Sequence, residues 1–470
     1  MSDPAPIIVW FRRDLRVRDQ LALKAAAETG RPVVPLYVRD AARAWAPGDA
    51  SKWWLAGSLA ALAGDLEDLG AKLVLRRGPA VETVMDVARE IGAGAVYLTR
   101  HHEPAEAADE AALHAALTAE DRECRRFGGG LLFEPETLLT KAGGPFKVFT
   151  PFYRAALAKG GIKAAEAAPE RLAAPATWPP GDRLSSWDLT PTGPDWAGGL
   201  RDSWTPGAAA ALARFEAFLA GGAAAYKGER DLPDIDGTSA LSPHLHFGEV
   251  SPRQVWQAAN FAADAHPEAR SGIEAFLREL VWREFCHALL HHWPQVPERA
   301  FNPLFDAFPW RDDVDALACW QRGETGYPIV DAGMRQLWHT GWMHNRVRMI
   351  VASFLTKHLL LDWRLGQAWF WDTLVDADLA NNAAGWQWVA GSGADAAPYF
   401  RVFNPILQGE KFDPAGDYVR KWVPELRDLP AKVIHAPWQA GAEVPGYPAP
   451  MVDHKAARER ALLAYKSLKD

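Results

Sequence analysis

The chain has 470 residues, of which 49% are hydrophobic and 23% are charged, and its formal net charge at pH 7 is −8. This length predicts two or three domains, and this composition is typical of a soluble globular protein and excludes a disordered or fibrous one. No apolar run is long enough to span a bilayer, and residues 1–6 lack the basic start and apolar stretch of a secretory signal.

The cysteines and tryptophans are both informative. Cys124, Cys286 and Cys319 are far apart in the sequence and form neither a disulfide framework nor a CxxC motif, so we expect a reducing cytoplasm. The acidic net charge argues against nucleic acid as a partner, but a local basic surface can still bind phosphates. The 22 tryptophans cluster after residue 280. An indole ring is large, flat and easily oxidised, so such a cluster can stack on flat ligands and pass electrons.

The first third of the chain alternates short β-rich runs with helical runs. Near-continuous apolar strands that alternate with helices predict a Rossmann-like parallel sheet covered on both faces. No GxGxxG fingerprint or P-loop accompanies it, so a dinucleotide site is not expected in this region. The expected strands are Ile7–Phe11, Val33–Val38, Lys72–Leu75, Ala95–Leu98 and Leu131–Phe133.

A helix is expected between the second and third of these strands. Leucines at positions 55, 59, 62, 66 and 69 recur at steps of three and four residues, which marks one buried helix face. Ser51 is the expected N-cap, and Gly70 is expected to end the helix.

The rest of the chain predicts a linker and a helical domain. Residues 131–206 are rich in Ala, Pro and Gly and have few periodic segments, so we expect an interdomain linker. From residue 207 to residue 470 nearly every segment has a helical pattern. The predicted architecture is therefore an N-terminal α/β domain over residues 1–130, the linker, and a large all-α domain over residues 207–470.

The first segment that could carry chemistry is 226–242, YKGERDLPDIDGTSALS. After Gly237, the hydroxyls of Thr238, Ser239 and Ser242 and the backbone N–H groups could hold a pyrophosphate. An ordinary turn is the simpler alternative for this segment alone. Ser251 and Pro252 then predict the start of a helix, with Ser as the cap and Pro in the first turn.

The second segment is a predicted helix over residues 274–292. Glu279, Trp282 and Arg283 lie three and four residues apart, so they share one face. An acid, an indole and a guanidinium together could hold an uncharged aromatic ligand beside a phosphate. A surface ion pair next to a core tryptophan is an equally good interpretation of the spacing.

The third segment covers residues 326–357 and mixes basic and aromatic side chains, a pattern that suits a nucleic-acid surface. There is no HExxH motif and no cysteine at ligand spacing, so no metal is expected and the histidines are interpreted as structural. One helix is expected to carry His339, Trp342, His344, Asn345, Arg346, Arg348 and Met349.

The fourth segment covers residues 376–405 and combines two Asp, two Asn, two Trp and a run of small residues. A buried carboxylate needs a partner, and Arg348 could pair with Asp376. Asp378 could accept hydrogen bonds from a ligand, and the small residues allow a flat ligand to approach the backbone. Because this pattern has no hydrophobic periodicity, it indicates a polar site.

Together these segments resemble the DNA photolyase/cryptochrome family. The resemblance rests on IVWFRRDLRVRDQLAL, which starts at Ile8, and on TGYPIVDAGMRQL, GWMHNRVRM, NNAAGWQW and DAAPYFRVFNP, and it extends to about Leu426. It implies an N-terminal α/β domain, a helical domain that binds FAD non-covalently in a U-shape, and often a second, antenna chromophore. Among the members, a bacterial cyclobutane pyrimidine dimer photolyase is the most similar in pattern.

The resemblance also implies roles for individual residues. Asn382 would face N5 of the flavin, and Trp386, Trp363 and Trp310 would pass electrons from the protein surface. The FAD-binding set would be Tyr226, Thr238, Ser239, Ala240, Leu241, Ser242, Arg283, Arg348, Asp376, Ala377, Asp378 and Asn382. The set near the DNA lesion and backbone would be Arg230, Glu279, Trp282, Asn345, Arg346, Met349, Trp388 and Arg401.

The implied activity is light-driven repair of damaged DNA. A poorly stacked cyclobutane pyrimidine dimer is flipped out of the duplex, and excited reduced FAD donates an electron that splits it. Burial among tryptophans would favour the protonated form of the Glu279 carboxyl group, which could then donate a hydrogen bond to the lesion. Damaged DNA is the expected partner, with no membrane and no metal, and the chain is expected to be a monomer.

Three alternatives remain within the same scaffold. A cryptochrome photoreceptor usually has a long C-terminal extension and often lacks the lesion acid. A six–four photoproduct photolyase has histidines at the positions that here hold Asn345 and Met349. A flavoprotein with only a redox role would not need the pair Trp282 and Trp388.

Two departures from the family pattern affect the expected ligands. Ala240 replaces a residue that is often basic in relatives, which weakens a backbone or phosphate contact. Ala105 and Glu106 stand where folate-binding relatives have Asn and Glu. Methenyltetrahydrofolate near Glu106 is therefore expected as the antenna in preference to a deazaflavin. Trp53 and Trp54 could offer a stacking surface, although a core position is the better interpretation.

Overall fold

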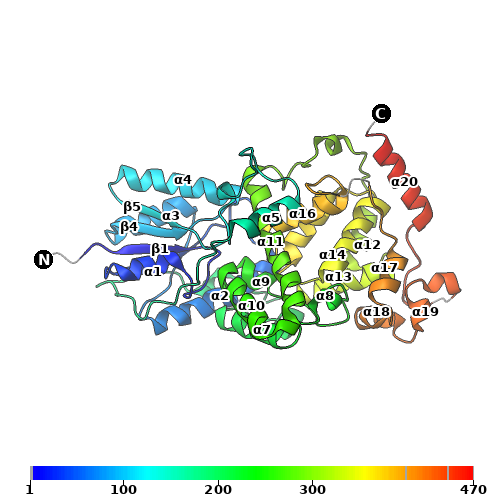
Figure 1. Ribbon diagram of the computed structural model, residues 1–470, viewed down its shortest axis with the longest axis horizontal. Coiled ribbons are helices and arrows are strands. Elements are labelled where there is room, and N and C mark those ends of the chain that lie inside the picture. The colour runs from blue at the N-terminus through cyan, green and yellow to red at the C-terminus, as the bar shows by residue number, and fades with distance from the viewer. Residues whose placement is uncertain (1–3, 397–399, 442–443, 469–470) are drawn as a thin grey trace.

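The computed structural model describes residues 4–396, 400–441 and 444–468, so residues 397–399 of the motif DAAPYFRVFNP lie outside the described residues. Figure 1 shows an elongated molecule with the β-sheet and its helices at one end and the helices of the later part of the chain at the other. The C-terminal helix α20 (His454–Lys466) lies at the end away from the sheet. The expected order, an α/β part followed by a larger helical part, is confirmed.

The sheet is parallel throughout its described strands, with the order β3-β2-β1-β4-β5. Ile7 lies between Val33 of β2 and Ala95 of β4, so β1 is central and its five residues are all buried. The strands are β1 (Ile7–Phe11), β2 (Val33–Arg39), β3 (Val74–Arg77), β4 (Ala95–Thr99) and β5 (Glu123–Phe127).

Helices cover both faces of this sheet, as the apolar strands predict. Alternate residues of β1 point to opposite faces. Val9 packs with α1 and α2, whereas Ile8 packs with α3 and α4. The helices are α1 (Leu21–Glu28), α2 (Asp49–Asp68), α3 (Ala80–Glu90) and α4 (Pro104–Ala119). The Rossmann-like arrangement expected for this part is therefore present.

Some details of this part differ from the expectation. The strand expected at Leu131–Phe133 is wrong: β5 is the polar segment ECRRF, which lies at the sheet edge and is largely exposed. Leu131 and Phe133 are buried outside the sheet because the backbone N–H groups at 132 and 133 bond to Glu284 instead of a strand. The strand expected at Lys72–Leu75 begins two residues later.

The ends of α2 are also instructive. Ser51 is not its N-cap, because the helix begins at Asp49 after Gly48, and the Ser51 hydroxyl donates to the Leu374 carbonyl at 3.0 Å. The expected end is confirmed: the helix stops at Asp68, and Gly70 has φ +82°, a left-handed conformation that suits glycine.

The connection at residues 131–206 contains more structure than its composition indicates. It holds η1 (Pro135–Thr137), α5 (Phe149–Lys159), η2 (Leu184–Trp187) and α6 (Gly198–Ser203). Helix α5 packs on α11 of the helical part. The segment after α5 returns to the sheet, where the Val33 N–H donates to the Ala173 carbonyl at 2.8 Å. The domain boundaries at 130 and 206 remain predictions.

The first helix after residue 206 is α7, which begins at Ala208. The α-helices of the helical part are α7 (Ala208–Ala220), α8 (Tyr226–Glu229), α9 (Ser242–His246), α10 (Pro252–Ala265), α11 (Arg270–His292), α12 (Val314–Arg322), α13 (Pro328–Thr340), α14 (Asn345–Ser353), α15 (Trp363–Thr373), α16 (Leu379–Ala390), α17 (Pro405–Phe412), α18 (Asp417–Trp422), α19 (Ala431–Ile434) and α20. Shorter turns are η3 (Pro267–Ala269), η4 (Pro303–Ala307), the π-helical η5 (Phe354–His358), η6 (Pro424–Leu426) and η7 (Pro437–Ala440).

Two expectations about helix ends can be compared directly. Ser251 caps α10 with a full capping box to Gln254, as predicted. The single helix expected to carry His339 through Met349 is wrong. Helix α13 ends at Thr340, Gly341 reverses the chain with φ +67°, and α14 begins at Asn345. Trp342 and His344 therefore lie in the turn between two helices.

Buried polar contacts join the α/β part to the helical part. Glu249 accepts hydrogen bonds from the Trp54 indole at 3.1 Å and from the Gly207 backbone at 2.7 Å. Asp19, which is fully buried, pairs with Arg253 at 2.6 Å. Each part therefore supplies partners for buried charges of the other.

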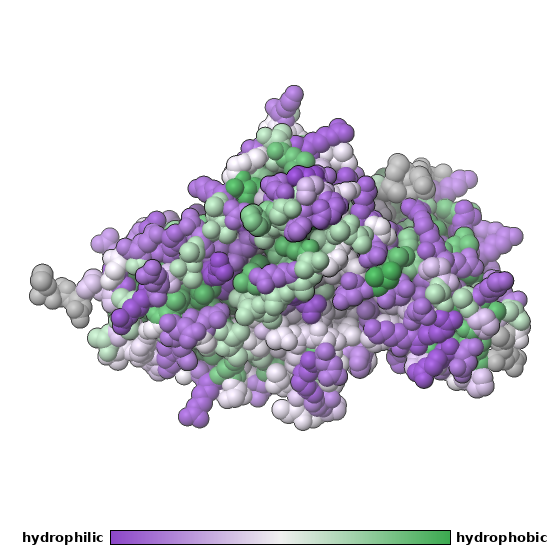
Figure 2. Space-filling model, turned by 60° about the horizontal axis from the view of Figure 1, so that its bottom comes forward, coloured by the Kyte–Doolittle hydropathy of each residue, from purple (hydrophilic) through white to green (hydrophobic). Residues whose placement is uncertain are grey.

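The outer surface is mixed in character. The face shown in Figure 2 has hydrophilic and hydrophobic residues side by side, as is usual for folded chains. Among the described residues, no helix is both long and apolar enough to cross a membrane.

Candidate active site

A cavity of 610 Å³ lies within the helical part. It is bounded by α8, α9, α11, α14, α15, α16 and the turn between α13 and α14. Its volume is in the range typical of cofactor and ligand sites. The predicted site residues that line it are Tyr226, Arg230, Ser239, Leu241, Ser242, Glu279, Trp282, Arg283, Asn345, Arg346, Arg348, Met349, Asp376, Asp378, Asn382, Trp386 and Trp388.

Six predicted residues are not part of the lining: Thr238, Ala240, Ala377, Trp310, Trp363 and Arg401. Ala240 lies in the left-handed region with φ +47°. The turn that it forms places Ser239 and Leu241 at the cavity. The Arg401 guanidinium lies 4.8 Å from the Phe403 ring centroid.

Hydroxyl groups lie at one end of the cavity. The Ser242 hydroxyl accepts a hydrogen bond from the Trp342 indole at 3.2 Å, and the Ser239 hydroxyl accepts from the Leu241 N–H at 3.4 Å. Tyr226 is buried against Phe218 and Phe276, and burial raises the pKa of its hydroxyl to about 12. Guanidiniums lie near these hydroxyl groups, because Arg230 is 5.5 Å from the Tyr226 ring centroid and Arg348 is 5.9 Å from the Trp342 ring centroid. Neutral donors and cations together suit a phosphate.

The predicted pair of Arg348 and Asp376 is confirmed. The Arg348 Nη2 lies 2.8 and 3.1 Å from the two carboxylate oxygens of Asp376, and its Nε donates to the Met343 carbonyl at 2.7 Å. The Asp376 side chain is only 3% exposed. The guanidinium thus compensates a buried carboxylate at the cavity wall and fixes its orientation.

Asp378 has partners that the sequence did not reveal. One of its oxygens caps α16 by accepting from the Asn381 N–H at 2.9 Å. The other faces His287 at 3.3 Å and His246 at 3.7 Å. Burial alone would raise the pKa of Asp378, but these histidines hold it well below its usual range. An ionised carboxylate therefore lines the cavity beside the amide of Asn382, whose nitrogen donates to the Gln367 carbonyl.

Glu279 and two tryptophans lie at another part of the cavity wall. The Glu279 side chain is 32% exposed and accepts a hydrogen bond from Arg230. The expectation that apolar burial desolvates this carboxyl group is therefore wrong for the structure described, because water and a guanidinium both reach it. Asn345 begins α14 and is exposed, whereas Met349 and Trp388 pack against the helical core.

The wall formed by Trp282 is supported from the connection. Phe149 of α5 stacks on Trp282 with ring centroids 3.6 Å apart and planes 10° from parallel. The Phe149 N–H donates to Asp395, whose carbonyl accepts from the Trp388 indole at 3.1 Å. Sequence analysis missed Phe149 because it assigned this stretch to a linker.

Three predicted tryptophans are arranged along neighbouring elements. Trp386 of α16 packs on α15 at Gly366, where an added Cβ would lie 2.1 Å from the indole ring. Trp363 is one turn before Gly366 on the same helix face. Leu361 forms an isolated parallel bridge with Arg311, the neighbour of Trp310. Trp386 and Trp363 are buried, and Trp310 is partly exposed.

The expected antenna residue Glu106 is already engaged. Its side chain is 8% exposed and pairs with Arg13 at 2.5 Å. Burial alone would raise the pKa of Glu106, but Arg13 holds it well below its usual range. Trp53 and Trp54 are in the core, as the simpler interpretation predicted.

Comparisons with known proteins show which sequences this chain is similar to. Residues 7–175 match the family model described as DNA photolyase, and residues 276–467 match the FAD binding domain of DNA photolyase. The chain is 53% identical to the deoxyribodipyrimidine photo-lyase of Agrobacterium fabrum, over 99% of this chain and 98% of that protein. It is 36% identical to Cryptochrome-1 of Arabidopsis thaliana, over 96% of this chain and 69% of that protein.

A solved structure is similar over the whole chain. The crystal structure of a bacterial class III photolyase from Agrobacterium tumefaciens superposes with a TM-score of 0.96 at 52% identity. The match covers all of this chain and 98% of that one. Both the sequence and the arrangement of the two parts are therefore shared with proteins of known class.

Proposed function

Since this chain belongs to the DNA photolyase/cryptochrome family, we propose that it is a deoxyribodipyrimidine photo-lyase that uses FAD and light to repair cyclobutane pyrimidine dimers in DNA. The observation that carries the proposal is that residues of both predicted sets, the cofactor set and the lesion set, line one cavity. We further propose that it acts as a monomer in the cytoplasm.

The residues of the cavity fit FAD. The cavity joins hydroxyl groups at Ser239 and Ser242 to the carboxylates of Asp376 and Asp378. Neutral donors at the first end suit a pyrophosphate, and the ionised Asp378 can accept from ring or ribityl donors. When bound, FAD would supply the photoexcited electron donor for the reaction. Arg348 would hold Asp376 in place for that ligand.

The lesion residues would bind a dimer that has left the duplex. A dimer is poorly stacked, so its extrusion costs less than that of a normal base pair. Trp282 and Trp388 would be the apolar walls, with Asn345 and Met349 beside them. Glu279 would exchange its contact with Arg230 for a hydrogen bond with the lesion. Arg230, Arg283, Arg346 and Arg401 would lie near phosphates.

Cofactor reduction would proceed through tryptophans. We assign Trp386, Trp363 and Trp310 to this role because they occupy successive elements from the cavity to the surface. An indole is easily oxidised, and the buried Trp386 Nε1 has no hydrogen-bond partner among the described residues, which leaves the ring held by packing alone. Asn382 would contact the flavin beside Trp386.

A second chromophore is a separate proposal. A folate, methenyltetrahydrofolate, is favoured over a deazaflavin because it is the common bacterial choice of the family. Since Glu106 is buried in its pair with Arg13, the folate contacts would differ from those of relatives with Asn and Glu. Mass spectrometry of the pigment released from fresh protein would identify it, and a deazaflavin or no second pigment would contradict the proposal.

The deciding experiment is illumination of an oligonucleotide that carries one thymine dimer, with the protein fully reduced. We expect thymine absorbance at the dimer to be restored, and no restoration of a six–four photoproduct, because Asn345 and Met349 replace the histidine pair which that chemistry needs. Glu279→Gln should lower the repair yield while FAD content persists. Glu274→Gln, an exposed position on the same helix, is the matched control.

The same illumination experiment distinguishes the repair enzyme from the alternative function. The cryptochrome relatives make a blue-light photoreceptor the second candidate. Failure to repair the dimer with reduced FAD bound, together with light-dependent reduction of the flavin, would favour the photoreceptor over the repair enzyme.

A further inference from the structure

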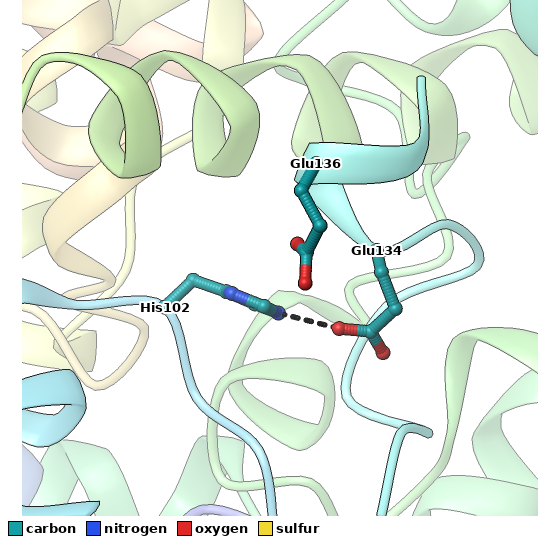
Figure 3. Close-up of side chains that lie close together, drawn as sticks. All are labelled: His102, Glu134 and Glu136. Atoms are coloured by element: carbon teal, nitrogen blue, oxygen red, sulfur yellow. Dashed lines mark ion pairs between the residues drawn. The ribbon is translucent and has the colours of Figure 1, made fainter. Parts of the chain in front are cut away.

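A second cluster of ionisable side chains lies at the junction of the two parts, outside the cavity described above. His102 follows β4, Glu134 precedes η1, and Glu136 lies in η1. Figure 3 shows the three side chains pointing toward one another from two separate segments of the chain. Sequence motifs for metals, such as HExxH, are local, so this arrangement was not predictable from spacing.

The three side chains present ligand atoms at short range. One nitrogen or oxygen from each lies within 4.8 Å of the others. The His102 Nε2 and the Glu134 Oε2 are 3.1 Å apart. Ligands about 2.1 Å from a tetrahedral Zn²⁺ are roughly 3.4 Å from one another. The separation of His102 and Glu134 is therefore close to the required one, and an oxygen of Glu136 lies within 4.8 Å of both.

The ligand atoms of His102 and Glu134 face the centre of the cluster. The His102 side chain is only 5% exposed, and its Nε2 faces the cluster. The Glu134 Oε2 is buried and pairs with two nitrogens, the His102 Nε2 at 3.1 Å and the Arg100 Nη1 at 3.2 Å. Gly128 leaves room for this carboxylate, because an added Cβ would lie 2.6 Å from its other oxygen. The Glu134 side chain is 25% exposed, and its Oε2 faces the nitrogens of His102 and Arg100 at the edge of the buried region.

Arg100 is the cation that now occupies the cluster. Its guanidinium lies 3.2 Å from Glu134 and 2.7 Å from Glu136. The Arg100 side chain is 29% exposed, so it can turn into solvent. His291 lies beside His102, with ring centroids 5.4 Å apart. Without Arg100, the two carboxylates present a charge that a divalent cation neutralises.

We propose that His102, Glu134 and Glu136 bind one divalent transition-metal ion of the Zn²⁺ type, in competition with the guanidinium of Arg100. One imidazole and two carboxylates are ligands that Zn²⁺ accepts, and water would take the remaining position. The Glu136 side chain is 41% exposed, which gives the ion a path from solvent.

The ion would join two parts of the chain. His102 belongs to the α/β part, whereas η1 packs on α11 of the helical part. A metal bound to both would add a bridge across the junction. Binding should therefore raise the unfolding temperature of the holoprotein, and FAD content should stay the same because the cluster lies outside the cavity.

The test uses the FAD-loaded protein, stripped with a chelator and dialysed against Zn²⁺ alone, with bound metal measured by elemental analysis. We expect one Zn²⁺ per chain. His102→Gln and Glu136→Gln should each weaken binding about tenfold or more. Arg100→Gln should strengthen it, because the competing cation is gone. His266→Gln is the matched control, since His266 is an exposed histidine beside Glu268.

Each outcome decides the proposal. Loss of Zn²⁺ in Glu136→Gln, whose exposed side chain is not needed for folding, with retention in His266→Gln, supports the site. Equal binding in all variants would mean an adventitious ion only, and no binding by the unaltered protein would also overturn the proposal. Unfolding temperatures measured with and without Zn²⁺ should show a rise that Glu136→Gln lacks.

Discussion

Replacing Phe149 by leucine should weaken the binding of a dimer-containing oligonucleotide while FAD content stays unchanged. Phe149 is 1% exposed and stacks on Trp282 at 3.6 Å, so it holds one of the two proposed lesion walls flat. Leucine keeps most of the volume but not the ring. The other aromatic neighbour of Trp282, Phe285, contacts it edge-on at 5.7 Å and cannot replace the stack.

The magnitude follows from the order that the stack provides. An aromatic pair contributes about 0.5–1.5 kcal/mol beyond its buried area. Immobilising a side chain during binding costs a similar amount, about 0.5–1.5 kcal/mol. In Phe149→Leu, the Trp282 ring would be free before the lesion binds and would have to be ordered during binding. Lesion affinity should therefore fall roughly two- to tenfold.

The assay is a titration of a labelled oligonucleotide with one thymine dimer, alongside the undamaged sequence. Phe305→Leu is the matched control, because Phe305 is also buried and stacks on Phe308 with planes 10° from parallel, away from the cavity. Lesion affinity unchanged within about twofold in Phe149→Leu would refute the reasoning. A parallel loss of FAD would show that the effect is not confined to Trp282.

Three further predictions concern buried groups. Burial raises the pKa of Glu284 to about 7, so between about pH 4.5 and 7 the folded protein holds a proton that the unfolded chain has lost. The free energy of unfolding should therefore fall as the pH rises through this range. Urea titrations should show a smaller fall for Glu284→Gln. Burial lowers the pKa of Lys357 to about 7, so the free energy of unfolding should rise from pH 7 to 9 by up to about 1.4 kcal/mol per pH unit, and Lys357→Met should lack the rise. Trp386→Phe should slow the reduction of the oxidised flavin by blue light, measured from the flavin absorbance after successive periods of illumination. An undiminished rate would show that another route of electron transfer dominates.

The sequence predicted the fold class because the central strands are buried on both faces and therefore apolar. Ile7–Phe11 was predicted with its observed bounds for this reason. The edge strand was missed because Glu123–Phe127 has only one neighbouring strand and is largely exposed, so its residues are polar. The apolar residues that follow it are buried by contacts with α11, which local periodicity cannot distinguish from a strand.

Much of the candidate site was predictable because its motifs are local. Asp376, Asp378 and Asn382 lie within seven residues and were identified together. His246 and His287 were not, because they meet Asp378 only after α9 and α11 have packed against α16. Phe149 was missed for the same reason, since nothing in its own segment indicates that a stacking partner lies on α11.

The contacts of Glu249 and Asp19 limit how this protein can exchange parts with its relatives. A chimera with a crossover between residues 160 and 197 would combine an α/β part and a helical part of different origin. It would have to inherit matching partners for both carboxylates, Trp54 for Glu249 and Arg253 for Asp19, because each carboxylate is buried with its counterpart on the other side of the crossover. The two parts are therefore expected to change together during evolution, although each also has a hydrophobic cluster of its own.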